Sequence, residues 1–387
     1  MLNFTFQNRT KIIFGRGTEE FTGEEIKKYG NKVLFHFGGG SIKRNGLYDR
    51  ICSSLKKSGA EWIELPGVKP NPRLSLVREG IEICRREKIE IILAVGGGSV
   101  IDSAKAIAAG TLFDGDIWDV FSRKRKLEKS LPVGVVLTIP AAGSESSNGS
   151  VVTDERDWSK LDMGGECLRP AFAIMNPELT YTLPPWQTAC GVADIMAHVM
   201  ERYFTKEKNV DFTDRLCEAT LKTVIRNAPL VMKDPENYSA RAEIMWAGSL
   251  AHNDLLGTGR TGDWASHNIE HELSALYDVA HGAGLAVIFP AWMKYVYQEL
   301  PEKIIQFAMR VWDVEYSISD PLRTAWEGIE RLEGFFKSLG LPTRLEELGI
   351  KDDRIAEMAQ RAYRWGDLGN YNKLTTEDIA NIYKLAR

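Results

Sequence analysis

The chain has 387 residues, of which 44% are hydrophobic and 26% are charged, and its formal net charge at pH 7 is −4. This length suits two domains of ordinary size, and the small negative charge gives no bulk attraction to nucleic acid or to an anionic membrane, so a small-molecule substrate is favoured. The five cysteines form no CxxC pair, which argues against a disulfide framework and a thiolate zinc site. No stretch of eighteen apolar residues and no signal-peptide pattern occurs, so we expect a cytoplasmic protein with no membrane partner.

Short apolar, β-branched runs alternate with amphipathic segments in the first half of the chain. The runs predict strands over residues 10–15, 31–37, 61–68, 89–96 and 131–140. Helical spacing of apolar residues predicts helices over 19–30, 46–59, 74–88 and 100–110. This alternation predicts an α/β domain with a mostly parallel sheet that is covered on both faces.

Two glycine triplets follow predicted strands. Gly96, Gly97 and Gly98 precede Ser99 and a predicted helix, where exposed backbone N–H groups and the helix dipole can attract a diphosphate. A plain strand-to-helix turn is the alternative, and the GxGxxG fingerprint is absent. The triplet at 38–40 leads into Ser41, Lys43 and Arg44 with no carboxylate beside it. If this loop contacts the adenosine ribose, it should accept NADP(H); the alternative is a solvated basic helix start.

After about Pro184 the apolar pattern has helical period and strand-like runs disappear. The sequence therefore predicts an α/β domain over 1–183 and an all-helical domain over 184–387. Domain junctions often form small-molecule sites. Arg260 in this half is expected to be a solvated loop residue.

Histidines are concentrated in the second half. Asp194 and His198 are spaced i and i+4, as are His267 and His271, and His281 follows shortly after. On a helix this spacing places two side chains on one face, which suits two ligands of one ion, and imidazole with carboxylate suits Fe(II) or Zn(II). Each histidine alone could instead be structural. Spacing leaves all five groups as candidates, one of which could carry a proton.

Three segments together resemble the iron-containing (group III) alcohol dehydrogenases, especially their butanol dehydrogenase branch. They are GGGSVIDSAK, the Asp194-x3-His198 pair, and WASHNIEHELSALYDVAHGAGLAVIFPAWMKYV. The resemblance covers nearly the whole chain. It implies a dehydroquinate synthase-like architecture, in which an N-terminal domain binds the nicotinamide dinucleotide, a C-terminal helical domain holds the metal, and substrate enters between them. It also implies a homodimer.

The resemblance also implies roles for individual residues. The metal ligands would be Asp194, His198, His267 and His281, with Fe(II) expected before Zn(II), and His271 would be a catalytic proton carrier that does not bind the metal. The residues implied to bind the cofactor, NADP(H) in preference to NAD(H), are Gly39, Gly40, Ser41, Lys43, Asn71, Gly96, Gly97, Gly98, Ser99, Asp102, Thr138, Ala141, Ser144, Lys160 and Leu179.

The predicted function is a metal-dependent alcohol dehydrogenase or aldehyde reductase that transfers a hydride between NAD(P)(H) and a small aliphatic alcohol or aldehyde. Trp264 and Trp292 could line an apolar substrate pocket, or could be ordinary core. A polyol dehydrogenase of the glycerol type and a cyclase resembling dehydroquinate synthase are alternatives within the superfamily. A metal-dependent hydrolase would leave both glycine triplets without a role. A regulator with a structural metal site is the alternative that is not an enzyme.

Overall fold

The structure is a computed structural model that describes residues 1–387 except for the side chain of Asp352. The chain forms two compact units. The α/β unit contains residues 7–183 and 235–253, and the helical unit contains residues 1–6, 184–234 and 254–387. The chain therefore passes between the units after Phe6, Leu183, Asp234 and Asn253.

The α/β unit is built on a six-stranded sheet in the order β1-β8-β5-β4-β2-β3, with every neighbouring pair parallel. Its strands are β1 (Lys11–Phe14), β2 (Lys32–Phe37), β3 (Glu61–Leu65), β4 (Ile91–Gly97), β5 (Val133–Ile139) and β8 (Phe172–Met175), and an antiparallel hairpin is formed by β6 (Gly149–Asp154) and β7 (Ser159–Gly164). Its helices are α1 (Thr22–Ile26), α2 (Ser41–Arg44), α3 (Leu47–Ser58), α4 (Leu74–Glu87), α5 (Gly98–Leu112), α6 (Trp118–Phe121) and α9 (Tyr238–Ala251), with 3-10 turns at Thr18–Phe21, Glu166–Leu168 and Pro177–Thr180.

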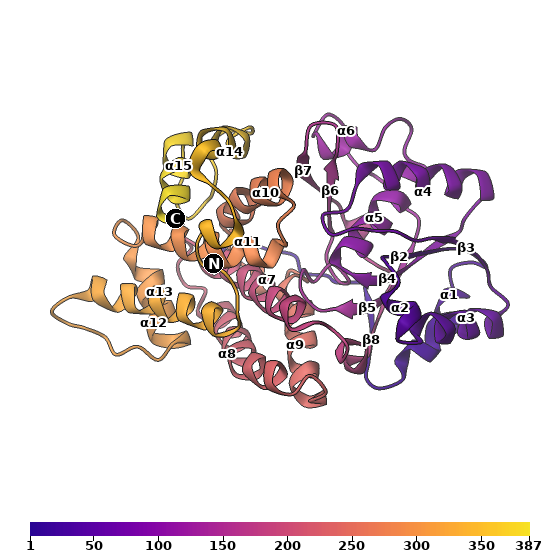
Figure 1. Ribbon diagram of the computed structural model, residues 1–387, viewed down its shortest axis with the longest axis horizontal. Coiled ribbons are helices and arrows are strands. Elements are labelled where there is room, and N and C mark those ends of the chain that lie inside the picture. The colour runs from indigo at the N-terminus through magenta and orange to yellow at the C-terminus, as the bar shows by residue number, and fades with distance from the viewer. The chain divides into compact units, whose positions relative to one another are not determined.

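Both faces of this sheet are buried, as parallel strands require. Val33, Phe35 and Leu93 point into a core beneath α1 and α3, whereas Leu34 and Ile92 point into a core beneath α4, α5 and α6. Figure 1 shows these two groups of helices on opposite sides of the strands. The alternation of side chains along each strand divides the apolar residues between the two cores.

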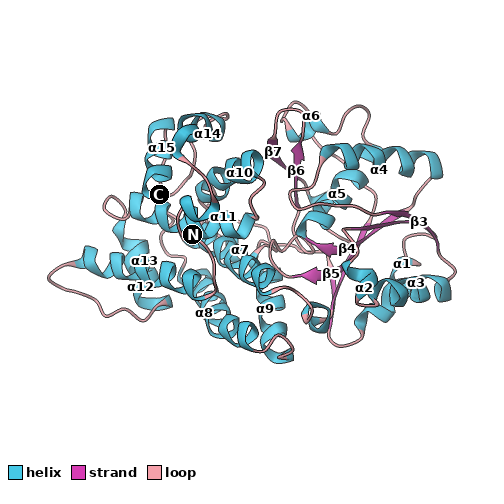
Figure 2. Ribbon diagram, in the orientation of Figure 1, coloured by secondary structure: helices cyan, strands magenta, loops and turns pink.

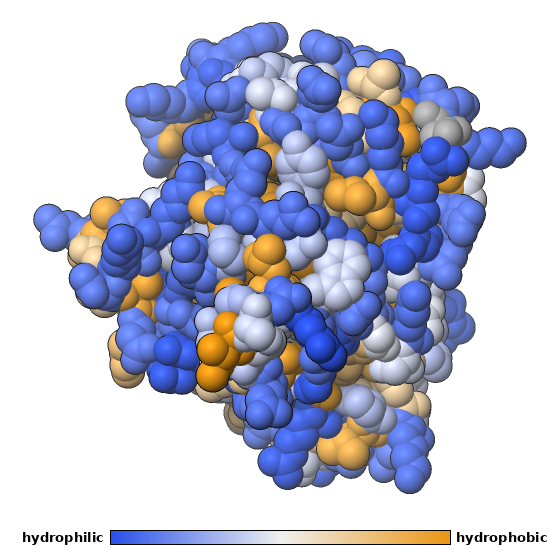
Figure 3. Space-filling view, turned by 90° about the vertical axis from the view of Figure 1, so that its left-hand side faces the viewer, coloured by the Kyte–Doolittle hydropathy of each residue, from blue (hydrophilic) through white to orange (hydrophobic). Residues whose placement is uncertain are grey.

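The helical unit consists of α7 (Pro185–Tyr203), α8 (Asp211–Lys233), α10 (Ala265–Tyr277), α11 (His281–Val296), α12 (Pro301–Val311), α13 (Pro321–Ser338), α14 (Ile355–Ala362) and α15 (Thr376–Leu385), with 3-10 turns at Leu255–Gly257, Glu346–Leu348 and Asp352–Arg354. All arrows in Figure 2 belong to the α/β unit. On the face drawn in Figure 3, hydrophilic residues cover most of the surface and apolar residues occur in small scattered groups. In the described part of the chain, no helix has both the length and the apolar character needed to cross a membrane.

Each strand predicted in the first half is present, with ends within three residues of the prediction. The parallel sheet with helices on both faces and the helical C-terminal part are confirmed. Strand β8 and the β6-β7 hairpin were not predicted. The expectation for Arg260 was wrong, because its guanidinium is buried, 2.8 Å from Asp214 Oδ1, and donates to the carbonyl of Val210.

Candidate functional site

Three helices of the helical unit bring a carboxylate and two imidazoles together. Asp194 lies in the middle of α7, His267 in the first turn of α10 and His281 at the start of α11. Each of the three offers a ligand atom within 4.8 Å of the others. Asp194 Oδ1 is 4.0 Å from His267 Nε2 and 3.8 Å from His281 Nε2. Both imidazoles therefore present the same ring nitrogen to one carboxylate oxygen.

Two of these atoms support a metal at this point. Asp194 Oδ1 and His267 Nε2 are both buried, and Asp194 as a whole is 4% exposed. Among the described residues, His267 Nε2 has no hydrogen-bond partner, and the nearest charged neighbour given for Asp194 Oδ1 is His198 Nδ1, 3.0 Å away but outside regular hydrogen-bond geometry. A buried polar atom without a partner costs roughly 1 to 3 kcal/mol, so such atoms usually meet water or an ion. One carboxylate oxygen with converging imidazole nitrogens is a donor set that suits a divalent ion of the iron or zinc type.

Two buried glutamates fix the orientation of these imidazoles. Glu201 accepts a hydrogen bond from His267 Nδ1 at 2.8 Å, and Glu270 accepts one from His281 Nδ1. With Nδ1 held in this way, Nε2 of each ring is the nitrogen that faces Asp194. Neither glutamate was predicted from the sequence. Their signal was helical spacing, since Glu201 lies seven residues after Asp194 and Glu270 three after His267.

His198 and His271 lie next to this group of three. His198 Nδ1 donates to the backbone carbonyl of Asp194 at 2.9 Å, and its ring centre is 4.5 Å from that of His267. His271 is one turn beyond His267, is only partly buried, and has its ring centre 5.6 Å from that of His281. Among the described residues, the group within 4.8 Å contains neither His198 nor His271 beside Asp194. His271 is instead grouped with Glu270 and His281.

Electrostatics favour the metal-binding protonation states. Burial alone would raise the pKa of Asp194, but His198, His281 and His267 outweigh burial and hold that pKa well below its usual range. Burial, with His198 and His281 nearby, lowers the pKa of His267 well below its usual value. An ionised carboxylate and a neutral imidazole are the forms that coordinate a cation.

The residues predicted for the cofactor lie mostly at one edge of the sheet. Strands β2, β4, β5 and β8 are neighbours and parallel, so their carboxyl ends meet at this edge. Gly39 to Lys43 follow β2, Gly98 and Ser99 open α5 directly after β4, Thr138 is the last residue but one of β5, and Leu179 follows β8. In open parallel sheets, this edge is where nucleotides bind.

Four further residues predicted for the cofactor lie on or beside α5 and the β6-β7 hairpin, namely Asn71, Asp102, Ser144 and Lys160. Asn71 is buried with a φ of 53°, and the carbonyl of Pro72 accepts from Thr153 N, while Lys160 pairs with Thr153 across the β6-β7 hairpin. The segment that follows Asn71 and the strand that carries Lys160 therefore both lie next to β6. Asp102 and Ser144 lie against each other, since Ser144 Oγ donates to Asp102 Oδ1 at 2.5 Å.

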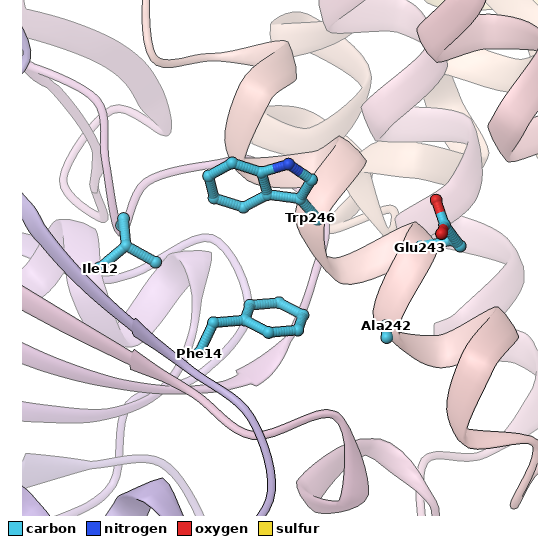
Figure 4. Close-up of a pocket in the computed structure, with 5 residues that line it drawn as sticks. All are labelled: Ile12, Phe14, Ala242, Glu243 and Trp246. Atoms are coloured by element: carbon cyan, nitrogen blue, oxygen red, sulfur yellow. The ribbon is translucent and has the colours of Figure 1, made fainter.

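An open pocket of about 450 Å³ lies elsewhere in the α/β unit. Ile12 and Phe14 of β1 and Ala242, Glu243 and Trp246 of α9 line it, and the rings of Phe14 and Trp246 lie next to each other (Figure 4) in edge-on contact. None of these five residues was predicted for the metal or cofactor site. Of the residues considered for a substrate pocket, Trp292 is fully buried and packs against Phe204 as core. Trp264 is only partly buried and lies beside the His267 ring.

Comparison with known proteins places both units in one family. The model of the iron-containing alcohol dehydrogenase family matches residues 9–177, and the model of the C-terminal domain of the Fe-containing alcohol dehydrogenase family matches residues 188–387. The chain is 46% identical over 384 residues to the probable NADH-dependent butanol dehydrogenase 1 of Bacillus subtilis, with 99% of each chain covered. It is 36% identical over 392 residues to the NADPH-dependent aldehyde reductase YqhD of Escherichia coli, with 100% of each covered.

A solved structure agrees with this assignment. The crystal structure of NADH-dependent butanol dehydrogenase A from Thermotoga maritima superposes with a TM-score of 0.96 and 43% identity, covering 100% of this chain and 99% of that one. The sheet, the helical unit and the full length of the chain are thus shared with a family enzyme. The chain belongs to the iron-containing alcohol dehydrogenase family.

Proposed function

We propose that the protein is a metal-dependent alcohol dehydrogenase or aldehyde reductase that transfers a hydride between NAD(P)(H) and a small aliphatic alcohol or aldehyde such as butanol or butanal. The observation that carries this proposal is the convergence of Asp194, His267 and His281, whose ligand atoms lie within 4.8 Å of one another, with His267 Nε2 buried and not hydrogen-bonded. The names of relatives, which include butanol dehydrogenases and an aldehyde reductase, support the substrate class.

Asp194, His198, His267 and His281 would hold the ion, with Fe(II) expected before Zn(II). When bound, a divalent ion acts as a Lewis acid that stabilises negative charge on the substrate oxygen during hydride transfer. The protein supplies an ionised Asp194 and a neutral His267 at neutral pH. Glu201 and Glu270 hold the rings of His267 and His281 in place. His198, with Nδ1 bonded to the carbonyl of Asp194, would complete the set through Nε2.

His271 would pass the proton between substrate oxygen and solvent. It is less buried than His267, lies one helical turn away, and has its ring beside that of His281. His271→Ala should therefore retain the metal and slow turnover, whereas His267→Ala should lose the metal. Equal metal loss from both variants, measured by elemental analysis, would contradict the assignment.

The cofactor would be held by the two glycine triplets and the loop after β5, with NADP(H) preferred. Lys43 supports this preference, because its ammonium lies on the ring face of Tyr48, 4.4 Å from the centroid, next to the ribose loop. Glu64 Oε2 lies 3.5 Å from the same ammonium, and a 2′-phosphate would compete with it for Lys43. Lys43→Ala should lower kcat/KM for NADPH and leave that for NADH nearly unchanged.

A homodimer is the proposed assembly. Among the described strands, β1 has one neighbour, β8, and is an edge strand of the sheet, and its other edge would pair with β1 of a second copy. Antiparallel pairing of two such edges about a two-fold axis is self-complementary. Light scattering should give twice the mass of the chain.

The function is tested by following absorbance of NADPH and of NADH separately with butanal, after the metal is removed and Fe(II) or Zn(II) is restored. We expect oxidation that depends on added metal and is faster with NADPH. Failure to oxidise either cofactor with any metal and a panel of aldehydes would reject the proposal.

A further inference from the structure

Lys105 is a lysine that no predicted function uses, and it is fully buried. It lies on α5, two turns after the glycine triplet, and its ammonium faces the segment between β5 and β6. Nζ donates to Ser144 Oγ at 3.0 Å, to the carbonyl of Ser147 at 2.9 Å and to the carbonyl of Gly149 at 2.9 Å. Three donors thus meet three acceptors, two in the loop after β5 and one in the first residue of β6, with Ser147 Oγ a fourth acceptor at 3.2 Å.

Asp102, one turn earlier on α5, carries the opposite charge and binds the same loop and β6. Its Oδ1 accepts from Ser144 Oγ at 2.5 Å, and its Oδ2 accepts from Val151 N at 3.1 Å. The hydroxyl of Ser144 therefore gives its hydrogen to Asp102 and accepts one from Lys105. It has no hydrogen left to donate to a cofactor phosphate, and both oxygens of Asp102 already accept hydrogen bonds from protein groups.

Burying this ammonium is expensive, and the surrounding charges offset only part of the cost. Burial lowers the pKa of Lys105 to about 8, with Asp102 and Glu145 acting to raise it and Arg169 acting to lower it further. Buried ionic groups of this kind contribute little net stability, and their best-attested use is to specify one arrangement among several. The arrangement specified here is that of the loop over residues 140–148.

The same loop is held from its other side. His252, which follows α9, has Nδ1 2.8 Å from the carbonyl of Ala142. Gly143 has a φ of +62°, and a Cβ there would lie 2.6 Å from His252 Cβ. On the inner side, a Cβ added to Gly98 would lie 3.0 Å from Ala142 Cβ. The loop therefore packs closely against Gly98, which is the last residue of the glycine triplet and the first residue of α5.

We propose that Asp102, Lys105 and Ser144 form a buried clamp that holds the loop 140–148 against Gly98 and so shapes the cofactor site without any of the three side chains contacting the cofactor. The inference rests on the proposed function, because that function places the dinucleotide at this loop. It assigns Asp102 and Ser144 as positioning residues, where resemblance implied contact, and adds Lys105 as a third.

The test compares Lys105→Met and Ser144→Ala with the wild-type holoenzyme. Loss of the clamp should raise the dissociation constant of NADPH, measured by titration calorimetry, and its KM about tenfold for Lys105→Met and less for Ser144→Ala. At saturating NADPH, kcat, the KM for butanal and the metal content should stay within about twofold of the wild type. The control is Lys57→Met, which removes an exposed lysine from α3 of the same unit.

Hydrogen exchange separates positioning from general damage. Faster exchange in Lys105→Met should be confined to peptides that cover residues 140–150. The double variant should bind NADPH no worse than Lys105→Met alone, since both changes release one loop. If Lys105→Met does not fold, Ser144→Ala carries the test alone. A wild type that binds no dinucleotide overturns the proposed function and this inference together, whereas a binding wild type with unchanged variants overturns the clamp only.

Discussion

In a histidine that is a candidate metal ligand, the ring nitrogen that points away from the metal site makes a hydrogen bond, and this bond fixes the orientation of the ring. Glu201 accepts this hydrogen bond from His267. It also accepts hydrogen bonds from the backbone N–H groups of His267 at 3.0 Å and Trp264 at 2.5 Å. One carboxylate therefore caps the start of α10 and orients a ligand in its first turn. Both carboxylate oxygens of Glu201 accept hydrogen bonds, from three N–H groups in total. In a glutamine at this position, the amide NH2 group would replace one of these oxygens and would point at an N–H group that it cannot accept from.

Glu201→Gln should consequently weaken metal binding by about 10- to 100-fold, the usual cost of losing such a partner. The measurement is the apparent dissociation constant for Zn(II) by competition with a chelator. Glu315→Gln, an exposed position in the same unit, is the matched control. Metal affinity in Glu201→Gln equal to that of the control would show that the hydrogen bond to His267 does not position the ring.

His36 shows how a buried histidine affects stability when it has no catalytic role. It is fully buried in β2, with Nδ1 2.7 Å from the carbonyl of Leu65 and Nε2 2.8 Å from Ser103 Oγ, and burial lowers its pKa to about 4. Because the unfolded chain binds a proton at a higher pH, the stability that the neutral ring contributes is complete above about pH 6.5 and is lost as the pH falls from there toward 4.

Between pH 7 and pH 5 this single group should account for a loss of about 2 kcal/mol in the free energy of unfolding. His36→Gln should be less stable than the wild type at pH 7, and its stability should fall by about 2 kcal/mol less over the same interval. Urea unfolding at the two pH values provides the measurement. Parallel pH dependences for the two proteins would show that His36 is not the group responsible.

At the scale of elements, the metal group depends on how closely α11 approaches α7. A Cβ added to Gly282, next to His281, would lie 2.0 Å from the carbonyl oxygen of Cys190 on α7. Backbone atoms cannot move aside as a flexible side chain can, so Gly282→Ala must separate the helices that carry Asp194 and His281. We expect a destabilisation of roughly 1 to 3 kcal/mol and reduced metal content.

Gly334→Ala is the matched control for this change. Gly334 also lies inside a helix, α13, but a Cβ there meets no atom within 4 Å. Alanine should stabilise that helix by roughly 0.5 to 1 kcal/mol. Unfolding curves and elemental analysis of both variants give the comparison, and a Gly282→Ala protein as stable and as rich in metal as the wild type would contradict the close-approach argument.

Elements with a strong apolar signal could be predicted from the sequence, and weak ones could not. β4 is seven buried residues and its prediction was correct to within two residues at its start. The β6-β7 hairpin contains polar residues such as Lys160 and Asp162 that reduce the apolar signal. β8, whose four residues are all buried, is as short as the four-residue β1 and was not predicted. The candidate ligands could be found by helical spacing. Glu201 and Glu270 also have helical spacing from ligands, but spacing alone did not select them, because their role depends on the orientation of the imidazole rings.

At the scale of the whole molecule, the pattern of apolar residues along the chain does not reveal which segments belong to which unit. Helix α9 lies between α8 and α10 in sequence, yet it belongs to the α/β unit. Met245 is part of the core beneath α4 and α5, Tyr238 stacks with Arg16 at 3.8 Å, and Trp246 packs edge-on against Phe14. Helical period predicts a helix and carries no information about which unit it packs on.

This assignment predicts how fragments fold. Residues 1–183 alone lack α9, so Met245 is missing from their core and the partners of Arg16, Phe14 and Ala142 are absent. We expect this fragment to show a broad urea transition and weak near-ultraviolet circular dichroism, which indicate loose side-chain packing.

Joining residues 7–183 to 235–253 through a flexible linker should restore a single cooperative transition, because the linked chain contains the whole α/β unit and its core. The matched control carries α8, residues 211–233, on the same linker, since that helix belongs to the other unit. Equal recovery with either helix, or full cooperativity of 1–183 by itself, would show that α9 is not required for the fold of this unit.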